Sequence, residues 1–261
     1  MQARATLWVG TSWKMNKTIG EAVDYATRLA AEPLPAAVQT FILPPHTALA
    51  AVRDVLRPYG SILLGAQNAH WAPEGAGTGE ISMRMAKDAG ASIVEMGHSE
   101  RREQFGETDT TVARKARAAL DHELTPLICV GEPATVRDAG QAEEFVAAQL
   151  AAATALLSPT ELGEVLVAYE PVWAIGVGGR PATAAQVAPV MAVMAEALTR
   201  RSGGRGCRAL LYGGGVDAGN AASLLRDPHT QGLFVGRAGW SASGLLELLE
   251  IAAGELRASG R

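Results

Sequence analysis

Cysteine is scarce in this sequence, and its scarcity excludes a disulfide-stapled fold. The 261 residues include only two cysteines, Cys129 and Cys207, which lie in unrelated sequence contexts. We therefore expect no disulfide framework. Cys129 falls in a short apolar segment, and we interpret it as a small buried hydrophobic residue rather than a redox centre.

Long apolar runs and basic clusters are missing as well. No uninterrupted apolar run approaches ~18 residues, the length that spans a membrane, and the N-terminus lacks a basic stretch followed by an apolar one. The chain has 23 basic and 27 acidic residues and a formal net charge of −4. We expect a cytoplasmic protein that binds neither nucleic acid nor a membrane, so an anionic substrate would have to be bound by local donors.

Short apolar segments alternate with alanine-rich segments along the whole chain. A hydrophobic content of 48% with only 19% charged residues suits a large core covered by helices. Strands are predicted at 6–10, 39–43, 61–66, 91–96, 125–130, 165–169, 209–213 and 232–235. Helices are predicted at 19–31, 47–56, 82–88, 111–122, 141–157, 184–201, 218–225 and 241–256.

Eight strand-then-helix units imply a parallel sheet with right-handed crossovers. No low-complexity linker separates the units, so one domain over residues 1–261 is predicted. This α/β pattern alone fits either a doubly wound open sheet or a closed barrel.

The segment 168–176, AYEPVWAIG, directly follows the apolar run 165–167. A carboxylate at the end of such a strand lies where a parallel sheet opens into its active-site loops. Pro171 stiffens the chain beside Glu170, and Gly176, Gly178 and Gly179 supply flexible joints. The pattern predicts a lid that closes over a general base, whereas an ordinary loop with a solvated Glu is the alternative.

This segment and six others occur in the order found in one enzyme family. The others are WKMN at 13–16, GAQN at 65–68, GHSERR at 97–102, CVGE at 129–132, YGG at 212–214 and GLFVG at 232–236. Over essentially its whole length the chain resembles the triosephosphate isomerases. The resemblance implies a single eight-stranded parallel β/α barrel (TIM barrel), a small phosphosugar substrate and no cofactor.

The long loop from Gln67 to Glu80 is rich in glycine and small residues. Loops of this length are usually functional or held by a partner. In the related isomerases the corresponding loop reaches into the neighbouring subunit, so the resemblance implies a homodimer. A surface excursion without a partner is the alternative.

Lys14, His98 and Glu170 each follow a predicted strand, at the ends of strands one, four and six. Such ends converge on one mouth of a parallel barrel. Together the three supply a cation, a polarising donor and a base, which a proton transfer next to a carbonyl requires. The resemblance implies that Glu170 shuttles the proton, that His98 donates as a neutral imidazole at a helix start, and that Lys14 stabilises the oxyanion. No metal is expected, because the other histidines show no paired ligand spacing.

Glycines after the last two strands predict phosphate binding. Gly215 ends the triplet 213–215 after strand seven, and Gly236 follows strand eight. Barrels of this kind often bind phosphate in these two loops through backbone N–H groups. Gly176 is expected to bring a further N–H group from the lid, and a tight turn is the alternative explanation for the triplet.

The sequence departs from the usual family pattern at the substrate site. Ser12 replaces the usual Asn, Gly215 replaces a Ser, Arg237 replaces a Gly, and the lid ends with VGGRP at 177–181. The segments 10–18 and 232–237 resemble the branch of L-erythrulose-1-phosphate isomerases. We therefore expect conversion of L-erythrulose 1-phosphate to D-erythrulose 4-phosphate, with Ser12 making room for a CH2OH group and Arg237 contacting the phosphate. Isomerisation of dihydroxyacetone phosphate to glyceraldehyde 3-phosphate, or a catalytically silent barrel, are the alternatives.

Overall fold

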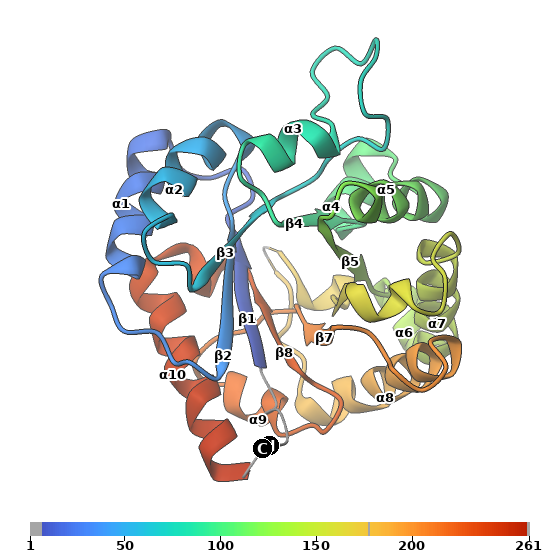
Figure 1. Ribbon diagram of the computed structural model, residues 1–261. Helices are drawn as coiled ribbons and strands as arrows, with labels where there is room; N and C mark the ends of the chain where they lie inside the picture. The colour runs from blue at the N-terminus through green and yellow to red at the C-terminus, as the bar shows by residue number, and fades with distance from the viewer. Residues whose placement is uncertain (1–6, 177, 260–261) are drawn as a thin grey trace.

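Eight parallel strands close into a barrel in the computed structural model, which describes residues 7–176 and 178–259 (Figure 1). Neighbouring strands pair in chain order, and β8 pairs with β1 to close the barrel. The strands are β1 (Leu7–Ser12), β2 (Val38–Leu43), β3 (Ile62–Ala66), β4 (Ile93–Met96), β5 (Thr125–Val130), β6 (Leu166–Tyr169), β7 (Ala209–Tyr212) and β8 (Gly232–Val235). The closed barrel is confirmed and the open sheet is excluded.

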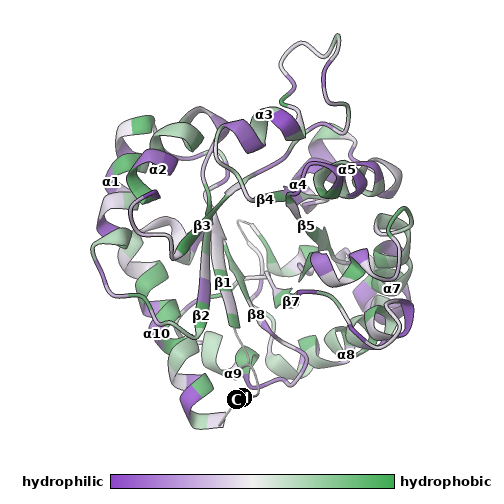
Figure 2. Ribbon diagram, in the orientation of Figure 1, coloured by the Kyte–Doolittle hydropathy of each residue, from purple (hydrophilic) through white to green (hydrophobic). Residues whose placement is uncertain are grey.

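Helices surround the barrel (Figure 1) and carry both hydrophobic and hydrophilic residues (Figure 2). They are α1 (Ile19–Ala30), α2 (Leu49–Leu56), α3 (Met83–Asp88), α4 (Ser99–Phe105), α5 (Asp109–Asp121), α6 (Ala134–Asp138), α7 (Ala142–Ala153), α8 (Ala184–Arg201), α9 (Ala221–Leu225) and α10 (Ala242–Ser259). Short 3-10 turns are η1 (His46–Ala48), η2 (Glu161–Glu164), η3 (Val172–Ala174) and η4 (Arg237–Trp240). The amphipathic helices thus cover the outer face of the barrel.

Several predicted boundaries differ from the structure. The strand predicted at 6–10 continues to Ser12, and residue 6 lies outside the described residues. The helix predicted at 141–157 ends at Ala153, because Thr154 leaves the helical conformation with φ of −110° and ψ of 14°. The Thr154 hydroxyl group donates to Leu150 O at 2.6 Å and accepts a hydrogen bond from Arg201. The short helix α6 was not predicted, since five residues after Pro133 show no helical period.

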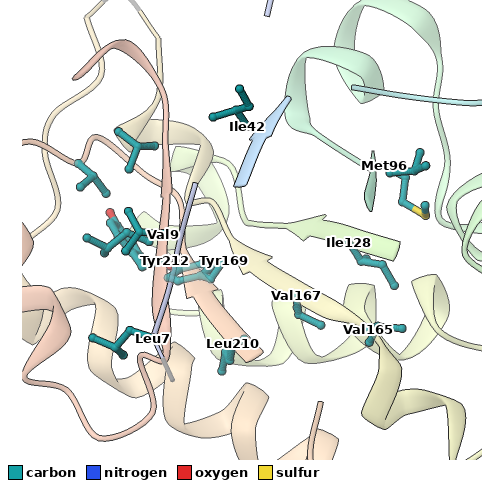
Figure 3. Packing of buried hydrophobic residues seen from close by; sticks show 14 of the residues in the cluster. Leu7, Val9, Ile42, Met96, Ile128, Val165, Val167, Tyr169, Leu210 and Tyr212 are labelled. Atoms are coloured by element: carbon teal, nitrogen blue, oxygen red, sulfur yellow. The ribbon is translucent and has the colours of Figure 1, made fainter. Parts of the chain in front are cut away.

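The core has two parts that follow the two faces of each strand. Side chains that point outward from the strands, such as Val9, Val167 and Leu210, pack between the barrel and the helices (Figure 3). Side chains that point inward, such as Phe41 and Ile93, fill the barrel interior. Successive side chains on a strand point to opposite faces, so this alternation determines which residues can reach the mouth of the barrel from inside.

The loop after β3 stands away from the barrel, beyond α3 (Figure 1). Its residues 73–80 are all exposed. Among residues 7–176 and 178–259, no helix is long and apolar enough to cross a membrane.

Candidate active site

A cavity of about 530 Å³ opens where the carboxyl ends of the strands meet. It contains every residue that the sequence predicted for the site. Those residues are Ser12, Lys14, His98, Glu170, Gly176, Gly215, Gly236 and Arg237. The barrel therefore brings together residues up to 225 positions apart in the sequence, because the carboxyl ends of all eight parallel strands lie at the same mouth.

Lys14 lies just beyond β1 in a left-handed backbone conformation, with φ of 55°. This conformation costs energy for a residue with a side chain. Gln67 stabilises it by donating from Nε2 to the carbonyl oxygens of Lys14 at 3.0 Å and of Leu43 at 2.9 Å. The Lys14 ammonium group lies 2.6 Å from Glu100 Oε1. Its charge is thus placed at one wall of the cavity and oriented by a neighbouring acid.

His98 caps the first turn of α4 and is buried. Its Nδ1 accepts a hydrogen bond from the Glu100 backbone N–H at 3.1 Å, so the ring proton of the neutral imidazole is on Nε2. Burial and the charge of Lys14 lower the pKa of His98 to about 4. Nε2 lies 3.6 Å from Glu170 Oε2. The ring is therefore neutral at pH 7 and presents an N–H donor next to the carboxyl group.

Glu170 directly follows β6 and is only 3% exposed. Burial, followed by the charge of Glu95, raises the pKa of its carboxyl group to about 8. Cys129 is buried as predicted, and its thiol partly offsets the rise in the pKa of Glu170. A Cβ atom at position 213 would lie 2.8 Å from Glu170 Cγ. Gly213 is thus needed for the carboxyl group to pack there.

Buried Glu132 connects the lid to the barrel wall. Its carboxylate accepts hydrogen bonds from Tyr169 Oη at 3.0 Å and from Trp173 Nε1 at 2.7 Å, and Val172 N–H donates to its carbonyl oxygen at 3.0 Å. Tyr169 lies beside Tyr212 at the end of β7 (Figure 3). The first half of the lid is therefore fixed by a charged acceptor that is removed from water.

The second half of the lid contacts the loop after β8. Arg237 donates from Nη2 to the Gly176 carbonyl oxygen at 2.9 Å. Gly176 and Gly178 have φ of 82° and 92°, which suits glycine joints, and Val177 between them lies outside the described residues. A Cβ atom at Gly215, whose φ is 44°, would lie 2.9 Å from Ala174 O. In this structure the guanidinium of Arg237 therefore holds the lid, a contact that the sequence did not predict.

Three acidic residues near the site were not singled out from the sequence. Glu100 and Glu132 lie inside recognised motifs, but their roles depend on contacts between distant segments. Glu95 could have been found from the sequence, because it is the one ionisable residue in the short apolar strand β4. Its neighbours Val94 and Met96 point outward, so Glu95 points into the barrel. Within residues 7–176 and 178–259, no group of three or more acidic, His or Cys side chains is arranged to hold a metal ion.

Comparison with known proteins agrees with this geometry. A family model described as triosephosphate isomerase matches residues 7–252. The chain is 50% identical over 260 residues to the L-erythrulose-1-phosphate isomerase of Mycolicibacterium smegmatis, an alignment that covers 97% of this chain and 96% of that protein. It is 48% identical over 254 residues to the protein of the same name from Mesorhizobium japonicum, covering 94% of this chain and 97% of that protein. For the one from Rhizobium rhizogenes the identity is 46%, with 98% of both chains covered.

Proposed function

Because the chain belongs to the triosephosphate isomerase family, we propose that its cavity isomerises L-erythrulose 1-phosphate to D-erythrulose 4-phosphate through an enediol. The observation that carries the proposal is the placement of Glu170, neutral His98 and Lys14 around one cavity whose wall includes Ser12. Relatives at 46–50% identity that bear this enzyme's name support the choice of the four-carbon substrate.

The reaction is a proton transfer between neighbouring carbons. The Glu170 carboxylate removes the proton from C3 of the substrate, and the electron pair forms a C2–C3 double bond while charge develops on the C2 oxygen. Glu170 then returns the proton to C2, and the hydroxyl proton passes from the C3 oxygen to the C2 oxygen, which leaves the carbonyl at C3. A carbon-bound proton is a very weak acid, so the base needs both its raised pKa and stabilisation of the enediolate.

His98 and Lys14 supply that stabilisation. The Nε2–H group of neutral His98 is a weak acid close in strength to the enediol, and it donates to the developing oxyanion without being fully deprotonated. The Lys14 ammonium adds a fixed positive charge at the wall of a partly buried cavity, where a charge acts more strongly than in bulk solvent. Both groups are fixed by Glu100 before substrate binds.

Backbone N–H groups bind the phosphate at the other end of the cavity. Within the described residues, the N–H groups of Gly215 and Gly236 donate to no other residue, and both residues line the cavity. Gly176 belongs to the same wall. Arg237 adds a positive charge beside the phosphate position and connects it to the lid, so phosphate binding and lid closure are coupled through one side chain.

The deciding experiment compares two substrates with the purified protein. We expect kcat/KM on L-erythrulose 1-phosphate to exceed kcat/KM on dihydroxyacetone phosphate. A preference for the three-carbon compound would assign the protein to the isomerases that produce glyceraldehyde 3-phosphate. Inactivity on both compounds, with the protein folded, would favour a silent barrel.

We also propose that the protein is a homodimer in the cytoplasm. Exposed residues 73–80 and the 97% exposed side chain of Met15 support a subunit interface at this side of the barrel, since exposed apolar groups and long loops favour a partner. Both cysteines are free thiols, as is usual in a reducing compartment. Light scattering of the intact protein and of a variant with residues 73–80 shortened tests the dimer, which only the intact protein should form.

A further inference from the structure

Strand β4 carries a carboxyl group that the mechanism above does not use. Glu95 is 3% exposed, and its Oε2 has no hydrogen-bond partner in the parts of the chain that the structure describes. Ile93 lies in the barrel interior, so Glu95, two residues later on the same strand, also points inward. An ionisable group among apolar interior residues is unfavourable for folding, and its presence therefore calls for a functional explanation.

Ser12 connects Glu95 to the cavity. Ser12 ends β1, lines the cavity next to the catalytic groups, and is 4% exposed. Its side chain points into the barrel interior, as that of Glu95 does, because Ser12 pairs in register with the interior residue Leu43. The backbone at Ser12 is held by the Trp240 indole, which donates to Ser12 O at 3.1 Å. Ser12 and Glu95 are thus a pair of inward-facing polar residues, of which Ser12 reaches the cavity wall.

Burial, above all, keeps a proton on the Glu95 carboxyl group. Burial is the main cause that raises the pKa of Glu95 to about 8, and the acids Glu100 and Glu107 act in the same direction, whereas Ser12 and Lys14 oppose the rise. Glu95 and Glu170 also interact unfavourably when both are charged. At pH 7 the Glu95 carboxyl group is mostly protonated, so the pair contains both hydrogen-bond donors and acceptors.

We propose that Ser12 and Glu95 form the subsite for the terminal CH2OH group of the four-carbon substrate, with Ser12 touching the hydroxyl group and Glu95 orienting Ser12. This inference rests on the proposed function. The four-carbon substrate differs from the three-carbon one by this CH2OH group at the reacting carbon. A wall without polar groups would leave its hydroxyl group unpaired, whereas a site built to pair it discriminates strongly between the two substrates.

The test measures kcat/KM on both substrates for the parent, Ser12→Ala, Glu95→Leu, Glu95→Gln and the Ser12→Ala/Glu95→Leu double variant. We expect Ser12→Ala and Glu95→Leu each to lower the four-carbon to three-carbon ratio by roughly 10–200-fold. The double variant should lose little more, because the two residues act as one unit. Glu95→Gln keeps a donor and an acceptor and should restore much of the ratio.

Thr40→Val is the matched control. Thr40 is a fully buried residue of β2 whose hydroxyl group has no partner among the described residues. Its side chain points away from the barrel interior, as that of Ile42 does. Its removal should leave the substrate ratio unchanged. Thermal unfolding separates specificity from structure: Glu95→Leu should unfold at the same or a higher temperature than the parent, and the gain should be larger at pH 9 than at pH 6.

If the parent prefers the four-carbon compound but Ser12→Ala and Glu95→Leu leave the ratio of kcat/KM values on the two substrates unchanged, the inference is overturned. The proposed function would remain intact in that case. A lowered unfolding temperature for Glu95→Leu together with equal losses would show that Glu95 is a structural residue. A parent that is inactive on L-erythrulose 1-phosphate would overturn the proposed function, and the subsite with it.

Discussion

Replacing Glu170 by Gln should slow catalysis by orders of magnitude and, at alkaline pH, stabilise the fold. Gln has nearly the same size but no basicity, so kcat should fall by about 10²–10⁴-fold or more. The stabilisation follows from burial, because the folded protein holds this carboxyl group where its ionised form is poorly solvated. A substitution that lowers activity but raises stability is expected at a residue that is retained for function rather than for the fold.

The size of the stability effect follows from the pKa. In the unfolded chain the carboxyl group titrates near 4.5, and in the folded protein near 8. Between these values the folded state binds a proton that the unfolded state has lost, so the free energy of unfolding falls as the pH rises. At 1.36 kcal/mol per pH unit, Glu170 destabilises the fold by about 2 kcal/mol at pH 6 and about 5 kcal/mol at pH 9. Above the folded-state pKa the loss levels off.

Thermal unfolding of parent and Glu170→Gln at pH 6 and pH 9 measures this difference. An uncharged Gln carries its own packing cost, but that cost does not depend on pH. The gap in Tm between variant and parent should therefore widen by roughly 6–12 °C from pH 6 to pH 9, given about 2–4 °C per kcal/mol for a chain of this size. A gap that stays constant with pH, or a kcat within a few-fold of the parent, would refute the assignment of Glu170 as a buried base.

Four further predictions follow from the same geometry. In the free enzyme kcat/KM should rise tenfold per pH unit up to about 8, where Glu170 ionises; an acid limb near 4.5 would contradict the raised pKa. NMR titration should give His98 a pKa of about 4, and a ring protonated at pH 7 would exclude the neutral donor. Ser12→Asn should lower kcat/KM on the tetrulose phosphate by roughly 10–200-fold more than on the triose phosphate, which steady-state kinetics on both compounds checks. Arg237→Gly removes the contact to Gly176 and should lower kcat/KM on both substrates by a similar factor, mainly through a higher KM. A loss of kcat/KM on one substrate alone would contradict a role of Arg237 in binding the phosphate that both share.

The sequence predicted the barrel and the residues around the cavity because both follow local patterns. Strand β5 (Thr125–Val130) and helix α8 (Ala184–Arg201) match their predictions residue for residue, since an apolar run and a capped helical period are local signals. The contact of Arg237 with the lid was not predictable, because it joins segments 61 residues apart. Glu132 was missed for the same reason: its partners lie on another strand and on the lid.

Unfavourable groups are concentrated at the carboxyl ends of the strands. Lys14 has a strained backbone, and Glu95 and Glu170 are buried acids, each with an unpartnered oxygen among the described residues. The barrel interior below them is filled by apolar side chains such as Leu166 and Phe234, and a large apolar core lies between the barrel and the helices. The lower part of the barrel thus supplies the stability that lets the upper part hold acids and a strained lysine. Because the base at Glu170 depends on burial for its strength, substituting these interior apolar residues would change its pKa as well as the stability of the fold.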